Sequence, residues 1–167
     1  FEDMEKKIVE NQIHAAIFCS PHNPCGRVWE KWEVQQAMEL YKKHDVMVIS
    51  DEIWSDILRP GVKHVPTQSV SEDARMRTIA LYAPSKTFNM AGLMISNIMI
   101  RDERLRHVWL SRHYNFDNPL SIAAAQAAYE KGEPWLEELR IYLDENFRFT
   151  GEYLAVHLPL AKYRVSE

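Results

Sequence analysis

The stretch Val46-Met-Val-Ile-Ser-Asp-Glu-Ile-Trp54 begins with mostly apolar residues and then turns to two adjacent carboxylates. A short apolar run bounded by polar residues predicts a strand that is covered on both faces, as in a parallel sheet. Two further runs of this kind, His14–Cys19 and Thr78–Tyr82, lie on either side of it in the chain. We therefore expect three parallel strands in one sheet, with residues 46–50 as the strand portion of the quoted stretch.

Around these strands the spacing of the apolar residues is helical. Residues 29–44 place apolar side chains on one face of a predicted helix, and Pro119–Lys131 has a proline in its first turn and Gly132 just past its end. The remaining expected elements are helices at 3–12, 102–112 and 134–154 and a fourth strand at 93–100. Strands that alternate with helices and are then followed by helices predict an α/β fold with a mainly parallel sheet flanked by helices.

Composition and charge limit the kinds of partner. The 167 residues are 46% hydrophobic and 26% charged, values typical of one soluble globular domain. The net charge of -4 gives no electrostatic basis for binding nucleic acid or an anionic membrane, and no apolar run is long enough to cross a bilayer. Two cysteines without a cluster of histidines predict reduced thiols in a cytoplasmic protein and no metal site.

The two ends of the sequence resemble cut points within a longer protein. The chain begins at Phe1, inside a helix-like segment and without a signal-peptide pattern. It stops within residues 161–167, where a short strand is predicted to begin. We therefore expect a domain that is incomplete at both ends.

Polar residues that packing does not require follow each of the three predicted parallel strands. They are Asn23 in the turn-rich segment Ser20–Gly26, Asp51 at the end of the quoted strand, and Ser85 and Lys86 in the loop after the third strand. Taken singly, each has an ordinary explanation, because asparagine suits a turn, aspartate suits a helix cap, and a lysine is most often a solvated surface charge. Ligands of open α/β sheets, however, bind outside the carboxyl ends of the strands, so we expect these side chains to converge on one site.

An amine, a carboxylate, an amide and a hydroxyl are the groups that pyridoxal 5′-phosphate (PLP) requires of a protein. The amine forms a Schiff base with the aldehyde, and the carboxylate keeps the pyridine nitrogen protonated so that the ring accepts electrons. The amide can donate to the ring oxygen, and the hydroxyl can bind the phosphate. The combination therefore indicates a PLP site.

Three motifs carry a resemblance to a known family. They are Ser20-Pro-His-Asn-Pro-Cys-Gly-Arg27, Ile49-Ser-Asp-Glu-Ile-Trp-Ser-Asp56 and Ala83-Pro-Ser-Lys-Thr-Phe-Asn-Met-Ala-Gly-Leu93. With them the chain resembles the fold-type I PLP enzymes, the aspartate aminotransferase superfamily. Within that superfamily it looks most like the cystathionine β-lyase (C–S lyase) branch, whose pattern His64-Val-Pro66 and Gly132-Glu-Pro-Trp135 also fit.

The resemblance implies a role for each site residue. Lys86 matches the Schiff-base lysine, which also acts as the general base, and Asp51 matches the carboxylate that pairs with the pyridine nitrogen. Asn23 matches the amide beside the ring oxygen, and Ser85 matches a ligand of the phosphate. The cofactor implied is therefore PLP, with Lys86 as the catalytic residue.

Two positions depart from the pattern of many aminotransferases in the superfamily. Trp54 stands where they have a tyrosine bonded to the ring oxygen, and Met94 stands where they often carry a phosphate-binding arginine. Both departures are familiar in the C–S lyase branch. The resemblance thus implies β-elimination on cystathionine, cysteine or another cysteine S-conjugate, giving a thiol, pyruvate and ammonia. The alternatives are an aminotransferase on the same scaffold and a non-catalytic PLP-binding regulatory protein.

The resemblance also implies how the protein is organised. Residues 1–157 are expected to be part of the PLP-binding large domain, with 134–157 as a long helix leading toward the small domain. Residues 158–167 are expected to start that small domain. The superfamily builds its sites at a subunit interface, so a homodimer that takes a small amino-acid substrate is expected.

Overall fold

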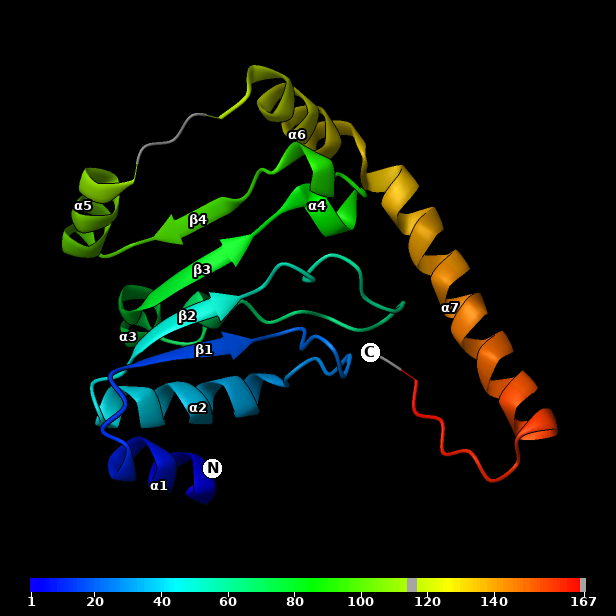
Figure 1. Ribbon diagram of the computed structural model, residues 1–167, viewed down its shortest axis with the longest axis horizontal. Helices are drawn as coiled ribbons and strands as arrows, with labels where there is room; N and C mark the ends of the chain where they lie inside the picture. Colours follow the sequence, from blue (N-terminus) through cyan, green and yellow to red (C-terminus); the bar gives the residue numbers. More distant parts are fainter. Residues whose placement is uncertain (114–116, 166–167) are drawn as a thin grey trace.

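The computed structural model of the protein describes residues 1–113 and 117–165, and its centre is a four-stranded sheet (Figure 1). In their order across the sheet, the strands are β1 (Ala15–Cys19), β2 (Met47–Asp51), β3 (Thr78–Tyr82) and β4 (Asn97–Ile100). The first three strands are parallel, and β4 pairs antiparallel with β3. The prediction of an α/β fold with a mainly parallel sheet is therefore confirmed.

Helices precede, connect and follow the strands. They are α1 (Glu2–Glu10), α2 (Lys31–Lys43), α3 (Glu72–Arg77), α4 (Pro84–Thr87), α5 (Glu103–Arg112), α6 (Pro119–Lys131) and α7 (Glu133–His157), with 3₁₀ turns η1 (Thr67–Ser69) and η2 (Ala91–Leu93). The helix predicted from residue 29 begins only at Lys31, because a capping box of Glu30 and Glu33 starts it there. The Trp29 indole lies outside the helix and donates to the Cys19 carbonyl (2.9 Å).

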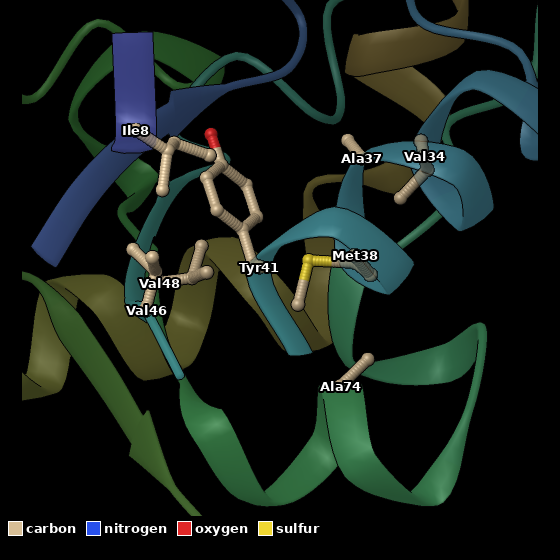
Figure 2. Packing of buried hydrophobic residues seen from close by; sticks show 8 residues of the cluster. All are labelled: Ile8, Val34, Ala37, Met38, Tyr41, Val46, Val48 and Ala74. Carbon is tan, nitrogen blue, oxygen red and sulfur yellow. The ribbon is translucent and has the colours of Figure 1, made fainter. Parts of the chain in front are cut away.

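The main hydrophobic core lies between the sheet and the helices α1, α2 and α3 (Figure 2). Its buried side chains are Ile8, Val34, Ala37, Met38, Tyr41, Val46, Val48 and Ala74. The four that belong to α2 repeat with the spacing of one helix face, as the sequence predicts. This packing fixes β2, and therefore the residues at its carboxyl end, against three helices.

The carboxyl ends of the three parallel strands meet at one edge of the sheet, called here the carboxyl edge. In the register of the strands, Cys19 lies beside Asp51, and Asp51 lies beside Leu81. The Ser20 amide donates to the Asp51 carbonyl (3.0 Å), and the Glu52 amide donates to the Leu81 carbonyl (3.0 Å). The segments that follow β1, β2 and β3 therefore start side by side.

Two local predictions are wrong. The run 93–100 is not one strand, because Met94 takes a left-handed conformation (φ 50°) and only Asn97–Ile100 pairs with β3. Lys86 lies on the one-turn helix α4 rather than in an irregular loop, because Pro84 has a fixed φ that suits the start of a helix.

α7 runs past the segments that follow β1 and β2 (Figure 1). Arg140 of α7 donates to the Leu58 carbonyl (2.7 Å), and Asp144 of α7 pairs with Arg59 (2.6 Å). Within the described chain α7 buries none of its residues, and large apolar side chains such as Phe149 are 65% exposed. Neither α7 nor any other helix of the described residues has both the length and the apolar character needed to cross a membrane.

Candidate active site

Asn23 lies in the tight turn that follows β1. The His22 amide donates to the Arg27 carbonyl (2.7 Å), and the Gly26 amide donates back to the His22 carbonyl (2.8 Å). Gly26 has a φ of 66°, a left-handed conformation that glycine adopts without strain. The turn leaves Asn23 exposed, so its amide is accessible to a ligand.

Asp51 is the last residue of β2 and is half-buried at the carboxyl edge. Its Oδ1 accepts a hydrogen bond from the Ile53 amide (3.2 Å), so the side chain is fixed by the chain that leaves the strand. No described cation forms a salt bridge with this carboxylate. Asp51 therefore has an oxygen that remains open to a donor at the carboxyl edge.

Contacts on both flanks hold α4, the helix that carries Lys86. Thr87 Oγ1 donates to Asp56 Oδ2 (2.8 Å), which joins α4 to the segment that follows β2. The Phe88 ring packs edge-on against Tyr129 of α6, with the ring centroids 5.9 Å apart. The backbone beneath the lysine is therefore tied to two other parts of the domain.

The Lys86 side chain extends over an aromatic face. Its Nζ lies 5.7 Å from the centroid of the Trp54 ring, within the range of a cation–π interaction. Lys86 is exposed and forms no salt bridge with another described residue. Trp54, whose part in the site the sequence leaves open, thus contacts the predicted catalytic residue.

The two other positions singled out in the sequence lie on either side of this lysine. Ser85 precedes Lys86 on α4 and is half-buried, and its carbonyl accepts a hydrogen bond from the Met90 amide (2.9 Å). Met94 follows η2 and is 89% exposed. Ser85 thus directly precedes Lys86 on α4, whereas the Met94 side chain has few neighbours in the described chain.

A cavity of about 300 Å³ lies between the segments after β1 and β2 and the helix α7. Asn23 and Trp54 line it from the sheet side, and Leu143 and Phe147 line it from α7. Asp51 and Lys86 are absent from its described walls. The predicted site residues therefore share the carboxyl edge, but this cavity encloses only part of the set.

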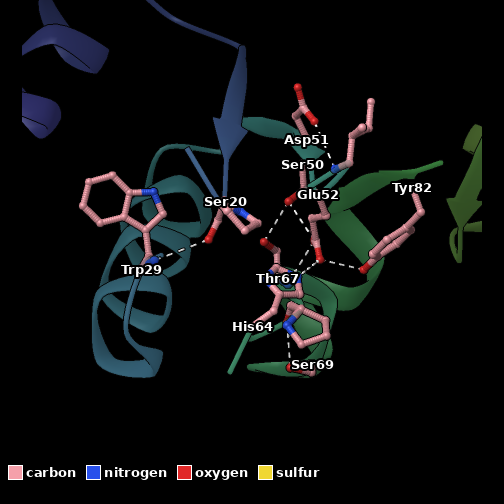
Figure 3. A network of polar contacts seen from close by, with 12 residues as sticks. Ser20, Trp29, Ser50, Asp51, Glu52, His64, Thr67, Ser69 and Tyr82 are labelled. Carbon is pink, nitrogen blue, oxygen red and sulfur yellow. Dashed lines mark hydrogen bonds and ion pairs between the residues drawn. The ribbon is translucent and has the colours of Figure 1, made fainter. Parts of the chain in front are cut away.

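A second polar cluster, the Glu52 network, lies on the other side of the end of β2 from the Asp51 carboxylate (Figure 3). It consists of Ser50, Glu52, His64, Thr67 and Tyr82. Glu52 is fully buried, and its Oε1 accepts from Ser50 Oγ (2.8 Å) and from the Thr67 amide (3.1 Å). Its Oε2 accepts from the Tyr82 hydroxyl (2.6 Å) and from His64 Nε2 (2.5 Å).

The charge state of the Glu52 network follows from its contacts. Burial disfavours an ionised Glu52, but the hydrogen bonds from His64, Tyr82 and Ser50 outweigh burial and hold the pKa of this carboxyl below its ordinary value. Burial and the hydrogen bond to Glu52 raise the pKa of the Tyr82 hydroxyl, which therefore remains a donor. Because an ionised carboxylate only accepts, we assign a proton to His64 Nε2.

The fold and its edge together define a class of protein. An amine, a carboxylate and an amide at the carboxyl edge of a mainly parallel sheet are typical of α/β domains that bind a ligand outside the strand ends. Within the ranges 1–113 and 117–165, no group of three or more histidine, cysteine, aspartate or glutamate side chains is arranged to hold a metal ion.

The chain belongs to the aminotransferase class I and II family, which it matches over residues 1–160. It is 40% identical to cystathionine β-lyase PatB of Bacillus subtilis, over 97% of this chain and 43% of PatB. It is 31% identical to the protein MalY of Escherichia coli, over 98% of this chain and 43% of MalY. It is 43% identical to a PLP-bound C–S lyase from Staphylococcus hominis, whose solved structure matches with a TM-score of 0.96 over 99% of this chain and 42% of that chain.

These relatives confirm the resemblance to the PLP enzymes and to their C–S lyase branch. The chain spans less than half of the length of PatB and of MalY.

Proposed function

We propose that this chain is a large part of the cofactor-binding domain of a PLP-dependent C–S lyase. The substrate would be cystathionine, cysteine or another cysteine S-conjugate. One observation supports the proposal: Asn23, Asp51 and Lys86 lie at or shortly after the carboxyl ends of three adjacent parallel strands, in a chain that is 40% identical to a cystathionine β-lyase. The three residues have the functional groups that PLP requires, and the relatives indicate that the reaction is C–S bond cleavage.

The groups at the carboxyl edge fit PLP. Lys86 has an exposed amine without an ion-pair partner among the described residues, as covalent attachment to an aldehyde requires. Asp51 has a carboxylate oxygen left open for the pyridine nitrogen, and Asn23 has an exposed amide for the ring oxygen. The hydroxyl of Ser85, next to Lys86, would bind the phosphate.

PLP, when bound, supplies a protonated ring that accepts the electrons left on the α-carbon of an amino acid. Lys86 would hold PLP through its amine, and the same amine, once free, would remove the α-proton of the substrate as general base. The Asp51 carboxylate would hold the proton on the ring nitrogen. The Cβ–S bond then breaks with its electron pair on sulfur, which takes up a proton to give a thiol, and the three-carbon remainder reacts with water to give pyruvate and ammonia.

We further propose that residues 1–157 belong to the large domain, with 134–157 leading toward a small domain that starts at 158–167. The end of α7 at His157 and the exposed apolar side chains of α7 support this organisation. A homodimer is proposed on the same basis, because a partner subunit or a small domain would cover those side chains. A cytoplasmic location is proposed because Cys19 and Cys25 form no disulfide.

An aminotransferase is the second candidate, since the relatives of the chain include both cystathionine β-lyases and aspartate aminotransferases, and Asn23, Asp51 and Lys86 would serve both reactions. Trp54 and Met94, which stand in place of a tyrosine and an arginine, favour the lyase. A non-catalytic PLP-binding regulatory protein is the third candidate. The presence of both Lys86 and Asp51 argues against it.

The deciding experiment uses the full-length protein with PLP and L-cystathionine but without a 2-oxo acid. We expect pyruvate, measured with a coupled dehydrogenase, together with an equal amount of thiol. If pyruvate is absent and amino transfer starts on addition of a 2-oxo acid, the protein is an aminotransferase. If PLP binds and neither reaction occurs, the non-catalytic candidate is favoured.

A further inference from the structure

Glu52 joins the ends of the two strands that lead to the proposed catalytic groups. Its backbone amide donates to the Leu81 carbonyl (3.0 Å), and its carboxylate accepts from the hydroxyl of Tyr82, the last residue of β3 (2.6 Å). A single residue directly after β2 is therefore bonded to the end of β3 through both its backbone and its side chain.

The Glu52 carboxylate has a full set of hydrogen bonds from three separate segments. Ser50 belongs to β2, His64 and Thr67 belong to the connection before α3, and Tyr82 belongs to β3. Four donors on two oxygens fill the acceptor positions of a carboxylate, so its orientation is fixed. The carboxylate therefore links these three segments through four hydrogen bonds.

The Glu52 carboxylate connects the two strand ends that lead to Asp51 and Lys86, the residues that the proposed reaction needs. Asp51 immediately precedes Glu52, and the two carboxylates point to opposite sides of the strand end (Figure 3). On the other strand, Tyr82 is followed by Ala83 and Pro84, which lead directly into the helical turn that carries Lys86. A shift of the Tyr82–Glu52 contact would therefore change the position of Lys86 relative to Asp51.

A buried carboxylate by itself contributes little to the stability of a fold. Taking a charge out of water is costly, and well-packed apolar residues often serve as well or better. A carboxylate whose acceptor positions are all filled instead selects one geometry over its alternatives. Glu52 has this character, because each of its oxygens accepts two hydrogen bonds from the surrounding chain, whereas Nδ1 of His64 has no hydrogen-bond partner among the described residues.

We propose that Glu52, through Tyr82, is a positioning residue that fixes the Lys86 amine relative to the Asp51 carboxylate. The proposal rests on the proposed function, in which these two groups act on opposite ends of one cofactor. A displacement of about 1 Å from the reactive geometry lowers the rate on the order of 100-fold, so a small change in the Tyr82–Glu52 contact should lower the rate measurably.

The test compares three variants of the full-length protein loaded with PLP. Tyr82→Phe removes one donor from the network, and Glu52→Gln keeps the shape but replaces an acceptor oxygen with a donor. Tyr129→Phe is the matched control, because it keeps the ring that packs against Phe88 and removes only a hydroxyl whose one hydrogen bond, from Asn97, lies outside the network. The readouts are kcat, KM, and the visible circular dichroism of the bound cofactor without substrate.

We expect kcat to fall about 10-fold in Tyr82→Phe and about 100-fold in Glu52→Gln, with little change in KM. Both variants should also lose visible circular dichroism per bound cofactor, because this signal reports the orientation of the ring in its site. Tyr129→Phe should retain both properties. If Glu52→Gln does not fold, Tyr82→Phe alone decides the outcome.

The proposal is overturned if Tyr82→Phe and any folded Glu52→Gln match the control in kcat and in visible circular dichroism. It is also overturned if only thermal stability changes. If the unsubstituted protein turns over no amino acid, the proposed function fails separately. The dichroism of the bound cofactor then decides whether the Glu52 network positions it.

Discussion

The Lys86 amine lies 5.7 Å from the centroid of the Trp54 ring and has no ion-pair partner among the described residues. In the proposed reaction it both holds the cofactor and removes the α-proton. We therefore expect Lys86→Ala in the full-length protein to lower pyruvate release by at least roughly 1000-fold. Lys42→Ala, which changes an exposed lysine of α2, is the control and should leave the rate unchanged. Near-normal turnover by Lys86→Ala would contradict the assignment.

The Glu52 carboxyl should make stability depend on pH at the acidic end. Hydrogen bonds outweigh burial and hold its pKa in the folded protein below the ordinary value of 4.5, so folding favours the ionised form. This contribution is fully present above a pH of about 4.5 and is lost as the pH falls through the lower folded-state pKa. We expect the free energy of unfolding in urea to fall more steeply below that pH in the unsubstituted protein than in Glu52→Gln.

Two other carboxyls contribute to the same acid dependence, so the variants that are compared must both retain them. Hydrogen bonds from Lys43 and from Arg77 lower the pKa values of Glu5 and Asp73, and both carboxyls remain in Glu52→Gln. Glu39→Gln, which changes an exposed glutamate of α2, should keep the acid dependence of the unsubstituted protein. Equal slopes in the unsubstituted protein and in Glu52→Gln would show that Glu52 is not the source.

At the residue scale, the sequence predicts the site residues at the ends of the strands, but not the residues that hold those strand ends in position. Asn23, Asp51 and Lys86 each come shortly after an apolar run, and parallel strands bring such positions to one edge. Glu52 is adjacent to Asp51, but its partners His64 and Tyr82 are distant in the chain and obey no periodicity. Ser50 and Glu52 lie in the motif 49–56 and His64 lies in another motif of the resembled branch, but neither motif indicates that these residues contact one another.

At the scale of elements, periodicity predicts the regular segments and misses those that depend on a single dihedral angle. The run 93–100 has the composition of a strand throughout, yet Met94 adopts a positive φ and the strand starts only at Asn97. α4 is too short to show a helical period, so the sequence predicts a loop there. By contrast Pro119–Lys131 is predicted to the residue, because proline and glycine mark its two ends.

The junction of α6 and α7 makes its own prediction. A Cβ atom at Gly132 would overlap the Phe88 ring and the Ala128 carbonyl oxygen. Gly132→Ala should therefore push Phe88 away and destabilise the full-length protein by about 1–3 kcal/mol, the usual cost of overpacking. The denaturant midpoint measures this effect.

Gly92→Ala is the matched control for that substitution. Gly92 also lies in a short turn, but a Cβ atom there would meet nothing within 4 Å in the described chain. We expect the midpoint of Gly92→Ala to stay close to that of the unsubstituted protein. Equal midpoints for the two alanine variants would mean that the close approach of Phe88 to Gly132 does not limit stability.

At the scale of the whole molecule, one part of the chain has a core and another part lacks one. α1, α2 and α3 pack on the sheet around β2, whereas α5 and α7 bury none of their residues in the described chain. The sequence predicts α2 and α7 from the same kind of apolar spacing and also predicts helices at α1 and α5, whereas it does not predict the short helix α3. It does not reveal which apolar faces are covered within this chain, because that depends on the chain that lies across each face.

The exposed apolar surface leads to a prediction for residues 1–167 on their own. Val156, Leu158 and Leu160 are 74%, 56% and 98% exposed, and they continue the apolar side chains of α7 into the segment proposed to start the small domain. Surfaces of this kind bind apolar dyes and promote association. We expect the isolated chain to enhance the fluorescence of anilinonaphthalene sulfonate, per mole of chain, more than the full-length protein does.

The same isolated chain should release no pyruvate from L-cystathionine, because the cavity lined by Asn23, Trp54 and α7 does not include Asp51 or Lys86 among its described walls. The full-length protein, assayed at equal molar concentration with PLP, is the positive control. Dye binding without turnover would agree with a site completed by further chain or by a partner subunit. Turnover by residues 1–167 alone would instead mean that the carboxyl edge is already a complete active site, and the proposed small domain and homodimer would then have no part in the chemistry.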